Sequence, residues 1–404
     1  MGTEKIRMVK EPARKIPVLA ETDVLVVGGG PAGVAAAIAA ARGGASVWLV
    51  ERHNHLGGLW TGGLVLPYLS THGRSKGGKT MRVIYGVGGE MYERFARMNM
   101  LHGEINPSID PEAGKYLLDE MVREAGVNVL FHTWGAQVLM DGKAVKGVFV
   151  ENKSGRQIIL AKVVIDCTGD GDIFHWAGEN YDEMKYAIGL VSRLGNVDRI
   201  TGSGEWLGQP TPLKSANWYN MWGETEQCGT DALNLSRLQL KYRKEIWERA
   251  EKLRKTPGYE EVFLLDTASQ LGVRMSRILD GEYRLTLEDT MTYKSFGDAI
   301  GVSGAWTTIR YKGEGVPREQ RPYWQIPYGA LLPKTVENLL VAGRCFCFER
   351  ELVEDARVIG TCLVTGQGAG AAAAVAVRQG EMPRGIDRER LGKLLAEQGV
   401  WFGE

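Results

Sequence analysis

The apolar and polar positions near the N-terminus follow a regular pattern. A β-branched apolar run, Val24–Val27, leads into a glycine-rich turn, and an alanine-rich pattern over Ala32–Ala41 precedes a second apolar run, Ser46–Val50. Short apolar runs bounded by turn residues predict strands, and the intervening apolar pattern predicts a helix. The order strand, helix, strand predicts a βαβ unit, and therefore an α/β fold with parallel strands.

Alternating patterns follow this first unit. A helical pattern over Pro111–Ala125 precedes several extended segments, which are separated by turn residues such as Asp141–Gly142 and Ser154–Gly155. We predict that these segments form a β-meander beside the first unit. The segments are Val127–Phe131, Ala136–Met140, Ala144–Glu151 and Gln157–Ile165.

The pattern changes after Gly178. The sequence becomes irregular, charged and rich in tryptophan, and it contains an amphipathic helical run over Leu235–Lys255. A short apolar strand pattern returns at Asn338–Ala342, followed by an uncharged helical pattern from Val358. We therefore predict a discontinuous first domain, residues 21–178 and 330–404, a mixed α+β substrate or cap domain over residues 179–329, and an N-terminal extension over residues 1–20.

The uncharged run from Val358 to Val377 is about as long as a membrane span. Its apolar residues are mostly alanine and glycine, and it contains Thr361, Thr365 and Gln367. Small residues insert weakly into lipid and pack closely against other elements. We favour a buried helix beside a cofactor over a membrane segment.

The glycine-rich turn follows a predicted strand and opens a predicted helix, which is the context that makes a G-x-G-x-x-G match specific for a dinucleotide. Gly28 allows the tight turn, Gly30 lets a pyrophosphate approach the backbone, and Gly33 lets the helix lie close to the strand. The helix start, with Pro31 and Ala32, offers free N–H groups to an anion. Glu51 ends the next strand, where its carboxylate can accept hydrogen bonds from both ribose hydroxyls and would repel a 2′-phosphate.

NAD and FAD share this fingerprint, and three later motifs distinguish them. The segments His55–Leu59, Ile165–Asp172 and Asn338–Cys345, the last with the glycine-rich run from Gly360 to Gly370, resemble motifs of FAD enzymes of the glutathione-reductase structural superfamily. From about Asp23 to Arg378 the chain is similar to the FAD-dependent oxidoreductase family, which is related to fumarate-reductase flavoproteins and to the flavin domain of heterodisulfide reductase. The resemblance implies a Rossmann-like FAD-binding domain. The cofactor-binding residues it implies, with those of the turn, are Gly28, Gly30, Pro31, Ala32, Gly33, Glu51, Arg52, Gly57, Gly58, Leu59, Thr168, Gly169, Asp170, Gly343, Arg344, Gly360 and Thr361.

The same resemblance implies positions for the C-terminal motif. Gly343 and Arg344 should border the pyrophosphate, and the helix starting near Gly360 should direct its N-terminus at the pyrimidine side of the flavin. Negative charge accumulates there when a hydride reaches flavin N5, and a helix N-terminus would stabilise it.

Candidates for the chemistry beside the flavin come from general principles. His72 lies in a glycine-containing segment that can reach a flavin face, and histidine is a common proton carrier near neutral pH. Arg274 and Arg310, together with Arg277 and Arg357, are candidates for binding a carboxylate substrate, because guanidinium pairs with it in a bidentate manner. We expect Cys345 and Cys347 to be reduced, packed thiols, since a disulfide across one residue is strained.

Composition narrows the function further. Lysine and arginine total 49 residues and aspartate and glutamate also total 49, so no net charge favours nucleic acid or anionic membranes. The first residues lack the apolar core of a signal peptide, and the five cysteines form no C-x-x-C pair, which fits a reduced cytoplasm and argues against zinc or iron–sulfur clusters.

We therefore expect a metal-free cytoplasmic FAD-dependent oxidoreductase that transfers a hydride to or from a small-molecule substrate, with homo-oligomerisation left open. An electron-transfer subunit with a redox partner protein and a flavin-dependent RNA-modifying protein remain the alternatives.

Overall fold

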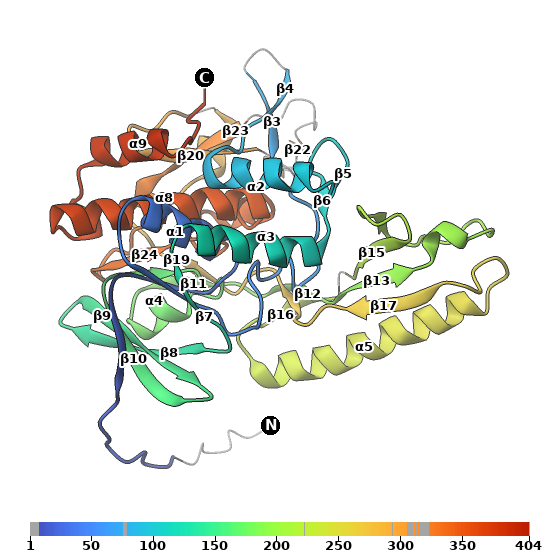
Figure 1. Cartoon of the computed structure of the whole chain (residues 1–404), viewed down its shortest axis with the longest axis horizontal. Coiled ribbons are helices and arrows are strands. Elements are labelled where there is room, and N and C mark those ends of the chain that lie inside the picture. The colour runs from blue at the N-terminus through green and yellow to red at the C-terminus, as the bar shows by residue number, and fades with distance from the viewer. Residues whose placement is uncertain are drawn as a thin grey trace.

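The computed structural model describes residues 8–75, 79–221, 223–292, 294–304, 310–311, 314–315 and 323–403. A seven-stranded sheet lies on one side of the molecule, at the lower left of Figure 1. Its strands are β1 (Val18–Val27), β2 (Val47–Val50), β7 (Asn128–Leu130), β8 (Trp134–Asp141), β9 (Ala144–Asn152), β10 (Gly155–Asp166) and β24 (Leu339–Val341). The predicted α/β class is confirmed.

Strand β10 joins the two ends of the chain within this sheet. From Ile158 onward it runs parallel to β1, with Val24 opposite Val163 and Val27 opposite Asp166. On its other side the first half pairs antiparallel with β9, and the last residues pair parallel with β24, which comes from the C-terminal part of the chain. The carboxyl ends of β1, β2, β10 and β24 therefore lie at one edge.

The predicted meander is only partly correct. Strands β8, β9 and β10 form it, but the first predicted segment, observed as β7, lies at the opposite edge of the sheet and pairs parallel with β2. The reason is helix α3 (Pro111–Glu124), which precedes β7 and carries the chain across the sheet as the crossover of a parallel connection.

Two apolar helices pack against each other beside the sheet. Helix α1 (Pro31–Arg42) and helix α8 (Ile359–Gln379) approach so closely that a Cβ on Gly366 would lie 2.1 Å from the Ala32 carbonyl oxygen, and one on Gly370 would lie 2.1 Å from that of Ala36. Helices α2 (Gly86–Arg97), α3 and α9 (Arg388–Glu397) complete this layer (Figure 1).

Helix α8 contains the uncharged run considered above as a membrane segment. Among the described residues it is a helix long and apolar enough to cross a membrane, and its apolar window is 100% buried inside the protein.

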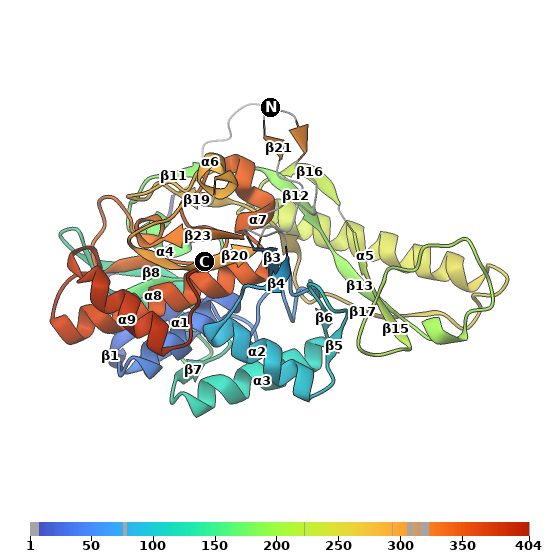
Figure 2. The ribbon, with the colours of Figure 1, turned by 90° about the horizontal axis from the view of Figure 1, so that it is seen from above.

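We call residues 179–329 the middle segment, and its boundaries stay a prediction. Part of it forms an arm that projects from the rest of the molecule (Figures 1 and 2). The arm holds a four-stranded sheet of β13 (Val191–Gly195), β14 (Gln209–Pro210), β15 (Ala216–Asn220) and β17 (Phe263–Thr267), together with helix α5 (Ala232–Arg254). Asp231 caps α5 by accepting from the amides of Leu233 and Asn234, and the helix buries Leu238, Tyr242, Ile246, Ala250 and Leu253 as the sequence pattern predicts.

The other elements are short. The paired strands are β3 (His72–Arg74) with β4 (Thr80–Arg82), β5 (Leu101–His102) with β6 (Ser108–Ile109), β11 (Tyr181–Glu183) with β19 (Arg277–Leu279), β12 (Tyr186–Gly189) with β16 (Glu224–Gln227) and β18 (Gly272–Val273), β20 (Ala299–Gly304) with β23 (Tyr323–Pro327), and β21 (Arg310–Tyr311) with β22 (Glu314–Gly315). The remaining helices are α4 (Asp172–Trp176), α6 (Leu287–Met291) and α7 (Val353–Ala356), with 3₁₀ turns at Val197–Arg199, Tyr328–Leu331, Arg350–Leu352 and Pro383–Gly385.

The close contact between α1 and α8 predicts that one added methyl group between the helices will destabilise the fold. Gly370→Ala places a Cβ against the Ala36 backbone, so we expect a loss of about 1–3 kcal/mol in the free energy of unfolding, measured by denaturant titration. Gly392→Ala is the matched control, because its Cβ meets nothing within 4 Å in helix α9, and it should be neutral or stabilise by up to about 1 kcal/mol. Equal unfolding curves for the two variants would contradict the close helix contact.

Candidate functional site

A cleft of about 1160 Å³, including the part open to solvent, lies at the carboxyl ends of the parallel strands. Ligands of open α/β sheets bind at this edge. The cleft brings together most of the cofactor residues predicted from sequence. Those that line it are Gly28, Gly30, Pro31, Ala32, Glu51, Arg52, Gly58, Leu59, Thr168, Gly169, Asp170, Gly343 and Arg344.

The glycine turn has the geometry that the sequence motif requires. Gly28 has a φ of +102°, and a Cβ on Gly33 would lie 1.7 Å from the Gly28 carbonyl oxygen, so both positions need glycine. A Cβ on Gly30 would meet nothing within 4 Å, although Gly30 lines the cleft. The space beside Gly30 is therefore a cradle at the start of α1, open to a phosphate group.

Glu51 is 5% exposed, and its carboxylate is held by two backbone amides. Gly29 N–H donates to Oε2 at 2.7 Å, and His53 N–H donates to Oε1 at 2.7 Å. A carboxylate has about four acceptor positions, so each oxygen keeps one for a further donor such as a ribose hydroxyl.

Two further parts of the cleft lie close to the glycine turn. Gly57 N–H donates to the Gly29 carbonyl at 2.8 Å, and a Cβ on Gly58 would lie 3.0 Å from Gly30 Cα. Arg52 places its guanidinium 4.9 Å from the ring centre of Trp134, and both side chains line the cleft. This arrangement supplies a flat wall and a positive charge on the Glu51 side of the cleft.

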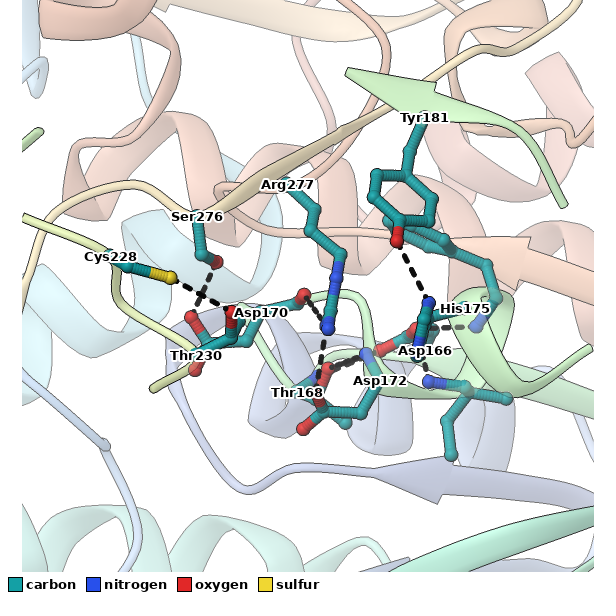
Figure 3. Close-up of polar contacts among 12 residues, drawn as sticks. Asp166, Thr168, Asp170, Asp172, His175, Tyr181, Cys228, Thr230, Ser276 and Arg277 are labelled. Atoms are coloured by element: carbon teal, nitrogen blue, oxygen red, sulfur yellow. Dashed lines mark hydrogen bonds and ion pairs between the residues drawn. The ribbon is translucent and has the colours of Figure 1, made fainter. Parts of the chain in front are cut away.

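Asp170 is the centre of a buried polar cluster (Figure 3). Its Oδ1 accepts from Ser276 Oγ at 2.6 Å and from Arg344 Nη2 at 2.7 Å. Arg277 donates to the Asp170 carbonyl at 2.9 Å and to Asp172 Oδ1 at 3.1 Å. Burial acts to raise the pKa of Asp170, but the Arg344 charge and the Ser276 hydrogen bond outweigh it and lower the pKa below its ordinary value.

Asp166 holds the turn on which Asp170 lies. Its Oδ1 accepts from the Thr168 amide at 3.0 Å and hydroxyl at 2.7 Å, and its Oδ2 accepts from the amides of Ile173 and Phe174 at the start of α4. Burial raises the pKa of Asp166 to about 6, while the donors from Thr168 act in the opposite direction. Asp166 thus fixes Thr168 and Gly169 at the cleft without reaching it.

The start of α8 meets the cleft differently from the prediction. Ile359 and Cys362 line the cleft, whereas Gly360 and Thr361 do not. Gly360 N–H donates to the Leu69 carbonyl at 3.1 Å, and the Thr361 hydroxyl donates to the Asp355 carbonyl at 2.7 Å. The helix end is close to the cleft as expected. The rotation of its first turn, however, directs Ile359 and Cys362 to the cleft in place of Gly360 and Thr361.

The structure does not bring His72 to the cleft. His72 begins β3, where its Nδ1 lies 2.9 Å from the Thr71 hydroxyl and its ring contacts Tyr92 of α2 edge-on. Burial lowers its pKa. The β3–β4 hairpin packs toward α2, beyond the helix layer, so the geometry does not support a role for His72 in proton transfer (Figure 1).

Of the four arginines considered for substrate binding, Arg274 is buried outside the cleft lining, and its Nη1 donates to the Ala187 carbonyl at 3.0 Å. The Arg310 side chain lies outside the described residues. Arg277 is bonded to Asp170 and Asp172 and is not part of the lining, whereas Arg357 does line the cleft.

Sequence reasoning missed several lining residues. His53, Gln270 and Leu271 contribute to the wall without having been assigned to it, and so does Cys167, which lies within the Ile165–Asp172 motif. Burial, and then the charge of Arg52, lower the pKa of His53. Cys345 and Cys347 are buried free thiols, and burial raises the pKa of both, so they are protonated at neutral pH. In the described part of the chain, no group of three or more His, Cys, Asp or Glu is placed to hold a metal ion.

Asp170→Asn tests the buried cluster. The variant leaves the Arg344 guanidinium without its anion, and we expect a loss of about 3–5 kcal/mol in the free energy of unfolding at pH 7. Because the folded pKa of Asp170 is lowered, its contribution is present above the unfolded value of about 3.9 and is lost as the pH falls through the folded pKa. The difference between variant and parent should therefore shrink below about pH 4, measured by denaturant titration against pH. A difference that stays constant with pH, or equals that of the exposed control Asp198→Asn, would refute the ion pair.

Gly30→Val tests the cradle at the start of α1. A Cβ at this position has open space in the protein, and the backbone conformation is ordinary, with φ −68° and ψ −176°, so the unfolding free energy should fall by no more than the modest cost of losing glycine as the N-cap. The valine side chain would fill the space that a pyrophosphate needs, so bound flavin, measured from absorption of the purified protein, should fall to a small fraction of the parent value. Gly297→Val is the control at an exposed loop with nothing within 4 Å. Full flavin occupancy in Gly30→Val would place the cofactor elsewhere.

Comparisons with known proteins agree with this geometry. The model of a family described as FAD dependent oxidoreductase matches residues 23–189 and 205–395. Thiamine thiazole synthase of Methanococcus aeolicus is 31% identical over 158 residues, 37% of this chain and 55% of that protein. Digeranylgeranylglycerophospholipid reductase of Methanosarcina acetivorans is 29% identical over 168 residues, 39% of this chain and 40% of that protein. The chain thus spans about half the length of the curated relatives it matches.

A solved structure shares the fold. The geranylgeranyl bacteriochlorophyll reductase-like protein of Thermoplasma acidophilum superposes with a TM-score of 0.50 at 14% identity, covering 94% of this chain and 84% of that one. Since the family model covers most of the sequence and the cleft has a dinucleotide cradle, the protein belongs to the FAD-dependent oxidoreductase family and is an enzyme with FAD as its cofactor.

Proposed function

We propose that this enzyme transfers a hydride between FAD and a small organic substrate that binds where the cleft meets the middle segment. One observation carries the proposal: a single cleft is lined both by the cofactor cradle at Gly30 and by residues of the middle segment. A substrate in the second part would lie next to a cofactor in the first. The lining residues from the middle segment are Gly229, Leu235, Gln270, Leu271 and Val273.

The residues that would hold FAD follow the length of the cleft. The amides at the start of α1 would bind the pyrophosphate, and the free acceptor positions of Glu51 would bind the ribose hydroxyls. Arg52 and Trp134 would cover the adenosine side, and Asp170 and Arg344 would border the remainder of the cofactor. Bound FAD supplies two-electron chemistry at flavin N5, where it accepts a hydride or returns one.

The start of α8 supports this chemistry electrostatically. Its first turn carries the positive end of a 21-residue helix to the cleft at Ile359. A fixed positive potential of this kind stabilises negative charge that develops on the reduced ring without any reorganisation of the protein. The contact of the Gly360 amide with Leu69 keeps the helix end in place.

Apolar residues of the middle segment would exclude water from the cleft. Leu235, Leu271 and Val273 present apolar side chains to the cleft, and the β18 strand that carries Val273 is paired to β12. An apolar wall lowers the local dielectric constant and strengthens the electrostatic interactions beside it. We assign His53 to the adenosine side rather than to proton transfer, because its amide is bonded to Glu51.

The test uses the purified enzyme with its flavin. Candidate alcohols, amines and hydroxy acids are mixed anaerobically with it, and bleaching of the oxidised flavin absorption is followed by stopped flow. A substrate deuterated at the reacting carbon should bleach the flavin more slowly, because the C–D bond breaks in that step. Flavin that is bound but bleached only by a protein electron donor would refute the proposal and favour an electron-transfer subunit.

A variant pair locates the substrate. Leu271→Trp places a larger side chain in the part of the cleft that the middle segment lines. Substrate-driven bleaching should therefore slow roughly 10- to 100-fold, while reduction by dithionite is unchanged. Leu265→Trp is the control, since Leu265 lies on the nearby β17 strand and is 40% exposed. Equal rates for the two variants would place the substrate outside this part of the cleft.

A further inference from the structure

Arg357 has an unused hydrogen-bond donor at the cleft. It follows helix α7 and directly precedes α8, and its side chain is 16% exposed. It lines the cleft beside Ile359 and Cys362. One terminal nitrogen, Nη2, donates to the Glu354 carboxylate, but the buried Nε has no hydrogen-bond partner among the residues that the structure describes. A buried N–H without an acceptor is costly, so this nitrogen is a candidate donor to a ligand.

Glu354 fixes the orientation of this guanidinium. The second oxygen of its carboxylate accepts from the Tyr186 hydroxyl on β12. Burial, and then the bond to Glu354, raise the pKa of Tyr186 to about 12, so the hydroxyl keeps its proton and remains a donor. Glu354 is thus held from two sides, and an ion pair with it accounts for Nη2 of Arg357 but not for Nε.

A second guanidinium lies in the same region. Arg274 follows β18, which pairs with β12, and its Nη1 donates to the Ala187 carbonyl, next to Tyr186 in the sequence. Its Nη2 lies 3.4 Å from Asn220 Oδ1. Burial, followed by the charge of Arg357, lowers the pKa of Arg274 to about 10. The Arg357 charge therefore disfavours the charge of Arg274, and an anion bound by Arg357 would offset this repulsion.

We propose that Arg357, supported by Arg274, binds a carboxylate group of the substrate at the α8 end of the cleft. The inference rests on the proposed function, because it names the substrate class of that same site. The Nε–H and a neighbouring Nη–H form the edge of a guanidinium that holds a carboxylate by two parallel hydrogen bonds. Glu354 and Tyr186 are positioning residues that hold this guanidinium at the cleft.

A carboxylate suits the site better than a phosphate. Ile359 and Cys362, the lining residues next to Arg357 in the sequence, offer little to the additional oxygens and charge of a phosphate, and Nη2 of Arg344, which also lines the cleft, is bonded to Asp170. A monoanion on an otherwise apolar molecule would satisfy Nε and leave the apolar wall in contact with carbon atoms. The carboxylate would then orient the adjacent carbon next to the cofactor.

The experiment uses the flavin-loaded full chain and a matched pair of probes, propionate and propionamide, which have similar shapes but differ in charge. Binding is read from the perturbation of the flavin absorption spectrum at constant ionic strength. We expect a saturable perturbation with propionate and with larger carboxylates, and a much weaker one with propionamide. Inorganic phosphate is titrated in parallel.

Variants connect this binding to Arg357. Arg357→Gln should weaken propionate binding about 10- to 100-fold at unchanged flavin content, and Arg357→Lys should recover part of the loss through its charge. Arg199→Gln is the control, because Arg199 forms an exposed ion pair with Glu261 and should bind propionate as the parent does.

Three results would overturn the inference: equal binding of propionate and propionamide, unchanged propionate binding in Arg357→Gln, or tighter binding of phosphate than of any carboxylate. Loss of flavin from Arg357→Gln would also overturn it, since the guanidinium would then serve the cofactor. If neutral substrates bleach the flavin independently of Arg357, the carboxylate site fails and hydride transfer stands. If propionate binds through Arg357 but no organic substrate bleaches the flavin, hydride transfer fails and the anion site stands.

Discussion

The contact between the backbones of α1 and α8 is the constraint on which the rest of the site depends. Gly366 and Gly370 have no side chain at the points where Ala32 and Ala36 approach them, and a single Cβ at either position would collide with a carbonyl oxygen. This contact places the start of a helix from the C-terminal part of the chain beside the cofactor turn from the N-terminal part. The positive helix end at Ile359, the guanidinium of Arg357 and the cradle at Gly30 can share one cleft only because these two helices lie so close.

The two ends of the cleft are chemically different. On the Glu51 side, a buried carboxylate and the Arg52–Trp134 pair suit a nucleoside. At the α8 end, the Arg357 guanidinium and a helix N-terminus carry positive charge, with Arg274 buried behind the lining, while Leu235, Leu271 and Val273 keep the wall apolar. Positive charge in a poorly hydrated site acts strongly on developing negative charge, so the groups proposed to bind an anionic ligand would also favour a reduced flavin.

The sequence was most informative where a function depends on neighbouring residues in the chain. The glycine turn, Glu51 at the end of the next strand and the uncharged helix at the C-terminus are local patterns, and the structure places them at the cleft as their spacing suggests. The place of β7 was predicted wrongly, because an isolated apolar run does not indicate which strand it will pair with. Ser276 and Arg277 were not assigned to the cofactor turn, since their contact with Asp170 spans more than a hundred residues. Whether Gly360 and Thr361 reach the cleft depends on the rotation of one helical turn, and whether His72 reaches it depends on the direction of a hairpin. A short sequence motif specifies neither of these.

The contacts of Asp170 also affect the order in which the protein can fold during its synthesis. Its carboxylate is held by Ser276 and by Arg344, residues that leave the ribosome long after the strand and turn on which Asp170 lies. The strand β24 and the helix α8, which complete the sheet edge and cover α1, follow later still. The N-terminal unit therefore emerges with an unfinished sheet and an exposed apolar helix, and the cleft cannot be complete until helix α8 has been synthesised.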